Sequence, residues 1–269
     1  MTTRPTTPEP TTGPAPAAPS HAGAASPRRR VLAQTAFEAR AILRNGEQLL
    51  VTIVVPVFAL IGLVEVDALD ISTGGLSRID FFAPGVLALA VMTSSFTSQA
   101  IASAFDRRNG VLRLLSTTPL GRGGLLAGKV VGVLVVEFVQ VVVIGLTAVA
   151  LGWRPDPLGV GLAVVAIALG TAAFTSLALL VAGTLRAEAV LAVANLALLV
   201  LALAGGVIVP ADRLPGAMAH IALLLPSGAL GEAMRGAFQL GTLPAWSLVV
   251  LVGWTAALGW GAARLFRWH

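Results

Sequence analysis

The residues whose types first suggest chemistry are Glu137 and Gln140, because they interrupt a long apolar stretch between Val130 and Trp153. A carboxylate in such a stretch is energetically costly and usually faces the interior of a helix bundle or a wet cavity. Gln140 follows about one helical turn later and lies on a similar face. One interpretation is the polar lining of a transport path or gate. The other is a hydrogen bond between helices, with Glu137 protonated, that fixes their packing.

A second apolar stretch contains a polar run from Thr93 to Gln99. Ser and Thr hydroxyls commonly hydrogen-bond between helices in membranes, so packing is the favoured interpretation of this run. The alternative is that the hydroxyls line a cavity. In that case Ser94 and Ser98 join the two residues above as candidates for a transport path.

The string from Gly123 to Lys129 matches G-x-x-x-x-G-K, the loop that cradles phosphates in many nucleotide-binding proteins. Val130, however, stands where Ser or Thr must hold Mg²⁺, and no strand precedes the string. We therefore interpret Lys129 as marking the cytoplasmic edge of a membrane span. Gly128 and Gly132 form a G-x-x-x-G pair, which permits the close approach of another helix.

Other constellations that could support catalysis are absent from the sequence. The chain has no Cys, which excludes disulfides, thiolate metal sites and a cysteine nucleophile. His21, His220 and His269 are too scattered to suggest a metal cluster, and neither H-E-x-x-H nor G-x-S-x-G occurs. We expect no catalytic residue, no metal site and no cofactor bound by this chain.

The elements that position these residues are predicted to be membrane-spanning helices. Hydrophobic residues make up 56% of the 269 and charged residues only 12%, whereas soluble domains carry about 25% charged residues. A span needs about 20 apolar residues, so the sequence predicts an all-α polytopic membrane protein with six transmembrane helices and no room for a soluble nucleotide-binding domain. The predicted spans are Leu49–Val66, Phe82–Ala104, Val130–Trp153, Leu158–Leu185, Ala189–Val209 and Ala245–Ala263.

Two segments precede the first span. Residues 1–27 are rich in Thr, Pro and Ala and carry almost no charge, so we predict a disordered cytoplasmic tail. Residues 28–269 are predicted to form a single membrane domain. Its first part, Val31–Gln48, mixes apolar and charged residues and predicts an amphipathic helix along the membrane surface.

The distribution of Lys and Arg predicts the orientation, because cytoplasmic loops carry an excess of these residues. An even number of spans places both termini on one side of the membrane. That side collects thirteen of the Lys and Arg residues near the spans, and the opposite side collects four. We therefore place both termini in the cytoplasm.

Two loops are longer than a simple connection requires. The inner loop, from Phe105 to Lys129, contains an amphipathic stretch between Asp106 and Leu115. The outer loop, residues 210–244, is apolar but is interrupted by Pro215, Pro226 and Gly231. Such short, broken segments predict re-entrant helices, whose free backbone groups need protein or water around them.

Both loops resemble those of type-2 ABC exporter permeases. The inner loop carries Phe105-Asp106-Arg107-Arg108-Asn109-Gly110-Val111-Leu112-Arg113-Leu114-Leu115 and then Thr117-Thr118-Pro119-Leu120, similar to the acidic-Arg-x-x-Gly-x-Leu run and the Thr-Pro-Leu step common in that family. The outer loop carries Val209-Pro210, Leu214-Pro215 and Leu225-Pro226, followed by Leu230, Met234 and Arg235. The resemblance covers about residues 30–269. It is strongest to the drug-resistance branch found in actinobacteria, which includes daunorubicin-type exporters, although Asp106 stands where Glu is more usual.

The resemblance implies the permease subunit of an ATP-driven exporter, with no enzymatic activity of its own. A separate ABC ATPase subunit is then expected to bind ATP and Mg²⁺. The resemblance also implies a second permease copy or a paralogue, a bacterial plasma membrane, and a hydrophobic or amphiphilic substrate such as a drug, an antibiotic or a lipid, moved outward.

The resemblance further implies roles for both loops. Val31–Gln48 is expected to be the interfacial connecting helix, and Asp106–Leu115 the coupling helix in a groove of the ATPase, with its arginines pairing to acidic residues and Val111, Leu112 and Leu115 filling the groove. The alternative is a solvated basic loop touching anionic lipid. The expected coupling residues are Asp106, Arg107, Arg108, Gly110, Val111, Leu112, Arg113, Leu115, Thr118 and Pro119. The expected outer gate is the hairpin that contains Pro210, Pro215, Pro226 and Arg235.

Three other functions remain open from the residues alone. An ion-coupled secondary transporter needs coupling residues near the midplane and usually repeated halves; Glu137 is the one strong candidate for such a residue, and no repeat is evident. A membrane enzyme lacks a catalytic constellation. A structural membrane scaffold is compatible with the sequence.

Overall fold

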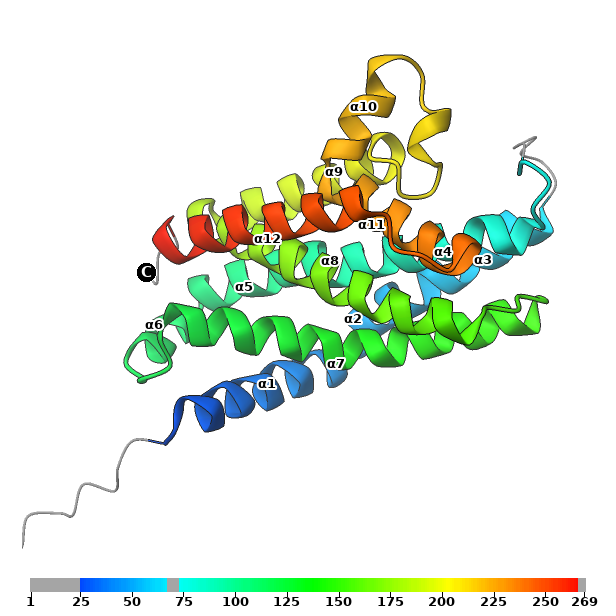
Figure 1. Ribbon diagram of the computed structural model, residues 1–269. Helices are drawn as coiled ribbons and strands as arrows, with labels where there is room; N and C mark the ends of the chain where they lie inside the picture. The colour runs from blue at the N-terminus through cyan, green and yellow to red at the C-terminus, as the bar shows by residue number, and fades with distance from the viewer. Residues whose placement is uncertain (1–24, 67–72, 266–269) are drawn as a thin grey trace, which may run out of the picture.

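The computed structural model describes residues 25–66 and 73–265 (Figure 1). Nearly all of the predicted disordered tail, residues 1–24, lies outside the described residues. The first helix, α1 (Pro27–Leu43), begins with Pro at its first position, where its missing N–H costs nothing. The Ser26 hydroxyl accepts a hydrogen bond from the amide of Arg29 and caps this helix.

The six predicted spans are confirmed, and the regular structure of the described residues is entirely helical. The first span, Gly46–Glu65, consists of α2 (Gly46–Leu49), the π-helical η1 (Leu50–Val54) and α3 (Val55–Glu65). The second consists of α4 (Arg78–Met92), the π-helical η2 (Thr93–Ser98) and α5 (Gln99–Arg108). The other four are α7 (Gly121–Ala150), α8 (Pro157–Thr184), α9 (Ala187–Ala204) and α12 (Ala245–Leu265).

The spans run in alternating directions, so the bundle has two distinct ends. One end holds the short helix α6 (Val111–Ser116), the turn between α8 and α9, and the last turn of α12 (Figure 1). At this α6 end, Arg122 at the start of α7 donates to the carbonyl of Ala263 in α12 over 2.7 Å. At the opposite end, Arg78 at the start of α4 donates to the carbonyl of Leu63 in α3 over 2.7 Å. The starts and ends of successive spans therefore alternate between the two ends of the bundle, as expected for the predicted six spans.

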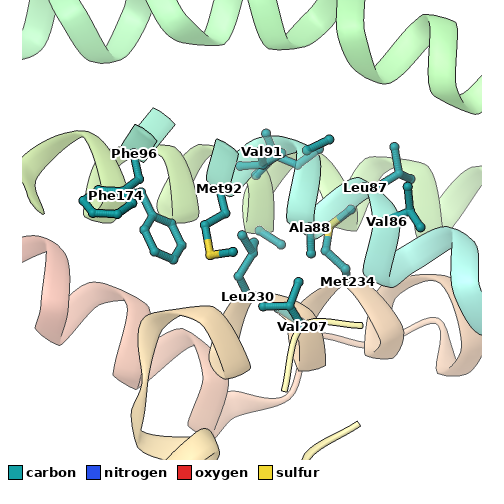
Figure 2. Packing of buried hydrophobic residues seen from close by; sticks show 14 of the residues in the cluster. Val86, Leu87, Ala88, Val91, Met92, Phe96, Phe174, Val207, Leu230 and Met234 are labelled. Carbon is teal, nitrogen blue, oxygen red and sulfur yellow. The ribbon is translucent and has the colours of Figure 1, made fainter. Parts of the chain in front are cut away.

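The apolar core lies around α8, which packs against α12, α5, η2 and α11 (Pro226–Arg235). Figure 2 shows its centre, where Phe96 of η2 and Phe174 of α8 lie with their ring centroids 6.4 Å apart. Met92 and Leu230 fill the space beside these rings and are fully buried. The second span is by far the most buried of the six, and within η2 the side chains of Ser94, Ser95, Phe96 and Thr97 are buried.

The outer loop forms a bent pair of helices, as the prolines predict. α10 (Ala217–Leu224) meets α11 and η4 (Gly236–Leu240) at an angle of 86°, and Pro226 begins α11 at the bend. α11 is buried among α4, α8 and α12, whereas α10 stands outside the bundle (Figure 1). The prediction of short, interrupted helices in this loop is thus confirmed.

α1 packs along α7 (Figure 1) through a face that combines polar side chains with Ala39 and Ile42. Gln34, Thr35 and Glu38 are buried against α7, while Leu32 and Phe37 are exposed. The predicted single helix over Val31–Gln48 is wrong in its length, because α1 ends at Leu43. The Asn45 side chain accepts a hydrogen bond from the amide of Gln48 over 3.1 Å and starts a new helix there.

Candidate functional site

The predicted coupling helix is divided at Gly110. This glycine has a φ of 80°, a backbone conformation that other residues adopt only with strain, so it ends the α5 direction and begins α6. Asp106, Arg107 and Arg108 therefore belong to the last turn of the second span, and only Val111–Ser116 projects as a separate short helix. The prediction of one continuous helix over Asp106–Leu115 is wrong, because the amphipathic pattern does not reveal that the backbone turns at Gly110.

The apolar side of α6 faces its own chain. Leu112 is fully buried in a cluster with Leu125, Leu179 and Ala262, so it cannot fill a groove on another subunit as predicted. Val111 and Leu115 are half-buried, whereas Leu114 has 69% of its surface exposed. Arg113 is also exposed. Arg113 and Leu114, together with Ser116, therefore form the free surface of α6, and Leu112 anchors the helix.

Arg107 and Arg108 both contact the turn between α8 and α9. Arg107 donates to the carbonyl of Leu185, and Arg108 lies 3.0 Å from the carboxylate of Glu188. The Arg108 guanidinium also lies over the ring of Phe105 at 4.4 Å from its centroid. These arginines thus attach the end of the second span to the start of the fifth. The Arg108–Glu188 pair is exposed, and an exposed pair contributes little to stability.

The loop after α6 contacts α1. The Thr118 hydroxyl donates to the carbonyl of Leu115 over 2.7 Å, and the Arg30 guanidinium of α1 donates to the carbonyl of Pro119 over 2.5 Å. Thr118 and Pro119 are themselves exposed. The predicted connecting helix, α1, and the coupling loop are therefore attached to each other.

Lys129, interpreted from the sequence as marking the cytoplasmic edge of the third span, is fully buried in an ionic cluster at the α6 end. Its ammonium group lies 2.8 Å from a carboxylate oxygen of Glu38 in α1 and 3.6 Å from one of Asp106 in α5. Gln34 donates to the same Glu38 carboxylate over 2.7 Å. We call Glu38, Lys129 and Asp106 the Lys129 cluster; it joins three separate helices at the α6 end.

The G-x-x-x-G pair brings α1 close enough to form this cluster. A Cβ atom on Gly128 would lie 2.5 Å from Cγ of Gln34, and one on Gly132 would lie 2.7 Å from Cβ of Glu38. Both distances are too short for real contacts, so any larger residue forces α1 away from α7. The signal for this contact was present in the sequence, but α1 was not identifiable as the partner helix.

Gln140 and Ser94, two of the candidates for a transport path, lie together in the structure. The Ser94 hydroxyl is 2.6 Å from Oε1 of Gln140, whose amide group donates to the carbonyls of Thr52 and Ala90. Thr52 belongs to η1, and Ser94 belongs to η2. A π-helical turn changes the local backbone pairing and often occurs at functional sites. Gln140 thus joins the irregular turns of the first and second spans to the third.

Glu137 lies elsewhere, between α7 and α8. Its Oε2 accepts a hydrogen bond from the Thr171 hydroxyl over 2.5 Å, and its side chain is buried. Oε1 is also buried and has no hydrogen-bond partner among the described residues. Glu137 and Gln140 therefore contact different helices, which favours the helix-packing interpretation over a shared polar lining.

Ser98 lines a groove of about 490 Å³ between the first, second and fifth spans. Its wall combines polar side chains with apolar ones, and Thr97 of this wall has a buried hydroxyl without a hydrogen-bond partner among the described residues. Asn195 of α9 lines the same groove, a contact that no local sequence pattern indicates. The residues that line the groove are Asn45, Glu47, Gln48, Val51, Thr93, Thr97, Ser98, Ile101, Ala102, Phe105, Asn195 and Leu198.

At the opposite end, Arg235 links the bent helix pair to the segment that follows α9 by hydrogen bonds. Its guanidinium donates to the carbonyls of Gly206 and Val207 and lies 2.9 Å from Glu232. Arg235 is buried, and Glu232 also accepts a hydrogen bond from the amide of Ala211. The prolines of the predicted outer gate are spread over this region: Pro210 precedes η3 (Ala211–Arg213), Pro215 precedes α10 and Pro226 begins α11.

Comparison with known proteins supplies the family. No curated protein matches the chain. The family model described as ABC-2 type transporter matches residues 29–238, which include the Lys129 cluster, the groove and nearly all of the bent helix pair. Membrane domains of this family are transport components that generally do not catalyse reactions themselves and that partner an ABC ATPase subunit. The chain therefore belongs to the ABC-2 type transporter family and is the multi-pass membrane permease component of an ABC transporter.

Proposed function

We propose that this permease exports a hydrophobic or amphiphilic substrate through the groove between the first, second and fifth spans. The observation that carries the proposal is the lining of this groove, where hydroxyl and amide side chains lie beside Val51, Ile101 and Leu198. A substrate with an apolar body and a few polar groups fits such a wall, because sites of this kind bind through apolar surface and take orientation from a few polar groups.

A second copy of this chain, or a paralogue, completes the path in this proposal. Two observations support it. The groove is open on one side, and α9, which forms its rim, exposes Leu196, Leu199 and Leu203. Asn195 is exposed on the same helix, and a polar side chain within a span usually faces protein or a wet cavity rather than lipid. A facing copy would cover both the groove and Asn195.

Energy for transport is proposed to come from ATP and Mg²⁺ on the partner ATPase subunit. The ATPase is expected to contact the α6 end, where Arg113, Leu114 and Ser116 form the free surface of α6. The excess of Lys and Arg on this side supports its assignment to the cytoplasm of a bacterial plasma membrane. Outward movement of a drug, antibiotic or lipid-like compound then requires the groove to open alternately to the two sides.

The alternative of an ion-coupled transporter that uses Glu137 has little support. Glu137 is hydrogen-bonded to Thr171 between α7 and α8, and it is not among the residues that line the groove. An ion-binding carboxylate needs access to water from each side of the membrane in turn. We therefore do not propose a coupling ion.

The test is reconstitution of the permease with its ATPase in vesicles, with measurement of substrate-stimulated ATP hydrolysis for a panel of amphiphilic compounds. Ser98→Leu narrows the groove and is expected to lower stimulation by about tenfold, since one coupling contact commonly changes affinity by that order. Thr147→Leu in α7 is the matched control, because Thr147 bonds only within its own helix at the Val143 carbonyl and does not line the groove. Equal stimulation in the two variants would place the substrate elsewhere.

A further inference from the structure

Lys129 is the most deeply buried charged side chain of the α6 end, with none of its surface exposed. It lies in α7, whereas its two acidic partners come from α1 and α5. Surface lysines at the end of a span normally extend toward water or lipid phosphates. Here the ammonium group instead faces two carboxylates inside the protein, which makes binding of an external anion by this lysine unfavourable.

We propose that Lys129 is a positioning residue that transmits movement of the coupling segment to the third span. The inference rests on the proposed function, because it assumes that an ATPase moves the α6 end. In this arrangement α1, the end of α5 and the start of α7 move as one unit. A displacement applied at α6 or at α1 then reaches the groove and Gln140 through the Lys129 cluster.

The contacts around the cluster support a single moving unit. Asp106 lies four residues before Gly110, where the chain turns into α6, so a shift of α6 acts directly on this carboxylate. Glu38 lies in α1, whose first turn is attached to the coupling loop by the Arg30–Pro119 hydrogen bond. Lys129 contacts both Asp106 and Glu38. It belongs to the same helix, α7, as Gln140, which contacts the first and second spans.

The ion pairs of the Lys129 cluster explain why α1 resists sliding along α7. Apolar side chains tolerate a small shift of one helix along another, because their attraction does not depend on direction. An ion pair removed from water is far less tolerant, since separating the charges leaves each one without compensation for its lost hydration. Because Gly128 and Gly132 have no side chains, Gln34 and Glu38 lie in close contact with α7. This close contact fixes the position of α1 along the axis of α7.

The decisive variant replaces the central pair by apolar side chains of similar length, Glu38→Met with Lys129→Met. Removing Lys129 alone leaves the buried Glu38 carboxylate unpaired. Replacing both Glu38 and Lys129 leaves only Asp106 without its partner, and because that side chain is 32% exposed to water, folding can be preserved. The control is Arg40→Met with Arg44→Met, which places two methionines at exposed positions of α1 and its C-terminal cap, outside the Lys129 cluster, the coupling loop and the groove. A single Lys129→Met variant measures the cost of the unpaired carboxylates.

Three measurements separate folding, assembly and transmission. Because the chain has no Cys, cysteines placed at Ile42 and Val136, which pack in one apolar cluster, report by disulfide yield whether α1 keeps its position on α7. Co-purification of the ATPase reports assembly. Substrate-stimulated ATP hydrolysis and transport in vesicles report transmission.

We expect the single Lys129→Met variant to lower the disulfide yield. The Glu38→Met, Lys129→Met protein is expected to recover folding and ATPase binding. Its substrate stimulation of ATP hydrolysis is expected to fall by about tenfold, which corresponds to a coupling free energy of ordinary size. The control pair is expected to behave as the unsubstituted protein. Full stimulation and transport in the double Met variant, or equal loss in the control, would overturn the inference. Absence of any stimulation in the unsubstituted complex would instead contradict the proposed function, and the disulfide yield would still report the α1 position.

Discussion

Glu137 and Gln140 are three residues apart in α7, yet each contacts a different part of the bundle. Glu137 accepts a hydrogen bond from Thr171, whereas Gln140 contacts Thr52, Ala90 and Ser94. Both side chains are buried. Hydrogen bonds between transmembrane helices stabilise them by about 0.6 kcal/mol on average, so each residue contributes to helix packing without having to line a path.

The role of Glu137 can be separated from that of an ion-binding carboxylate by two substitutions. We expect Glu137→Gln to retain transport and stability, because the amide oxygen can still accept the Thr171 hydrogen bond. Glu137→Leu leaves the Thr171 hydroxyl unpaired and is expected to lower stability by about 1–3 kcal/mol. Thermal unfolding in detergent and transport in vesicles measure the two effects. Loss of transport in a stable Glu137→Gln protein would restore the transport-path interpretation.

At the scale of elements, the short helix α6 has two sides with different consequences. Leu112 is buried in the apolar cluster with Leu125 and Leu179, whereas Leu114 is exposed to a partner or to solvent. The two leucines are two residues apart on a helix, which places them on different faces. They therefore provide a matched pair of substitutions.

We expect Leu112→Ala to lower the free energy of unfolding by about 2–5 kcal/mol, because it leaves a cavity in a buried cluster. Leu114→Ala is expected to leave stability unchanged and to weaken ATPase binding. Unfolding followed by fluorescence of Trp residues and co-purification with the ATPase measure the two properties. If Leu114→Ala binds the ATPase normally and Leu112→Ala does not, despite equal stability, our assignment of the two faces is wrong.

The contact between α1 and α7 gives a second prediction at the scale of elements. Gly132→Val is expected to displace α1, since even a Cβ there lies 2.7 Å from Glu38, and overpacking costs about 1–3 kcal/mol. Gly145→Val in the same helix is the control, because a Cβ at Gly145 meets no atom within 4 Å. The yield of the disulfide between cysteines at positions 42 and 136 measures the displacement. The same yield in both variants would contradict the close contact.

At the scale of the whole molecule, the open side of the groove predicts where a second copy lies. We expect Asn195→Cys to form a disulfide between two copies in native membranes, because α9 borders the groove and exposes Asn195. Val164→Cys on α8 is the control, since Val164 is also exposed but does not line the groove. Non-reducing electrophoresis measures the dimer. Cross-linking through Val164 but not through Asn195 would place the second copy on another face.

Properties that sum over many neighbouring residues can be predicted without knowledge of the fold. Six apolar stretches of sufficient length determined the six spans, because the bilayer requires apolar surface and internally satisfied backbone groups over about 20 residues. Pro215 and Pro226 determined that the outer loop breaks into short helices, since proline cannot continue a helix without losing a hydrogen bond. The break predicted at Gly231 is wrong, because this residue lies within α11. The Asp106–Pro119 loop was located by its pattern and by its resemblance to a family that the match over residues 29–238 confirms.

Which face of each helix meets which partner depends on contacts between segments that are distant in the chain. Lys129 and Glu38 are 91 residues apart in the chain, and Ser94 and Gln140 are 46 apart, so no local pattern encodes these contacts. Leu112 was expected to face another subunit, because an apolar side is all that a helical period reveals; it faces Leu125 instead. The apolar pattern specifies that a helix is buried or exposed on one side, whereas the partner is selected by shape and hydrogen bonding between distant segments.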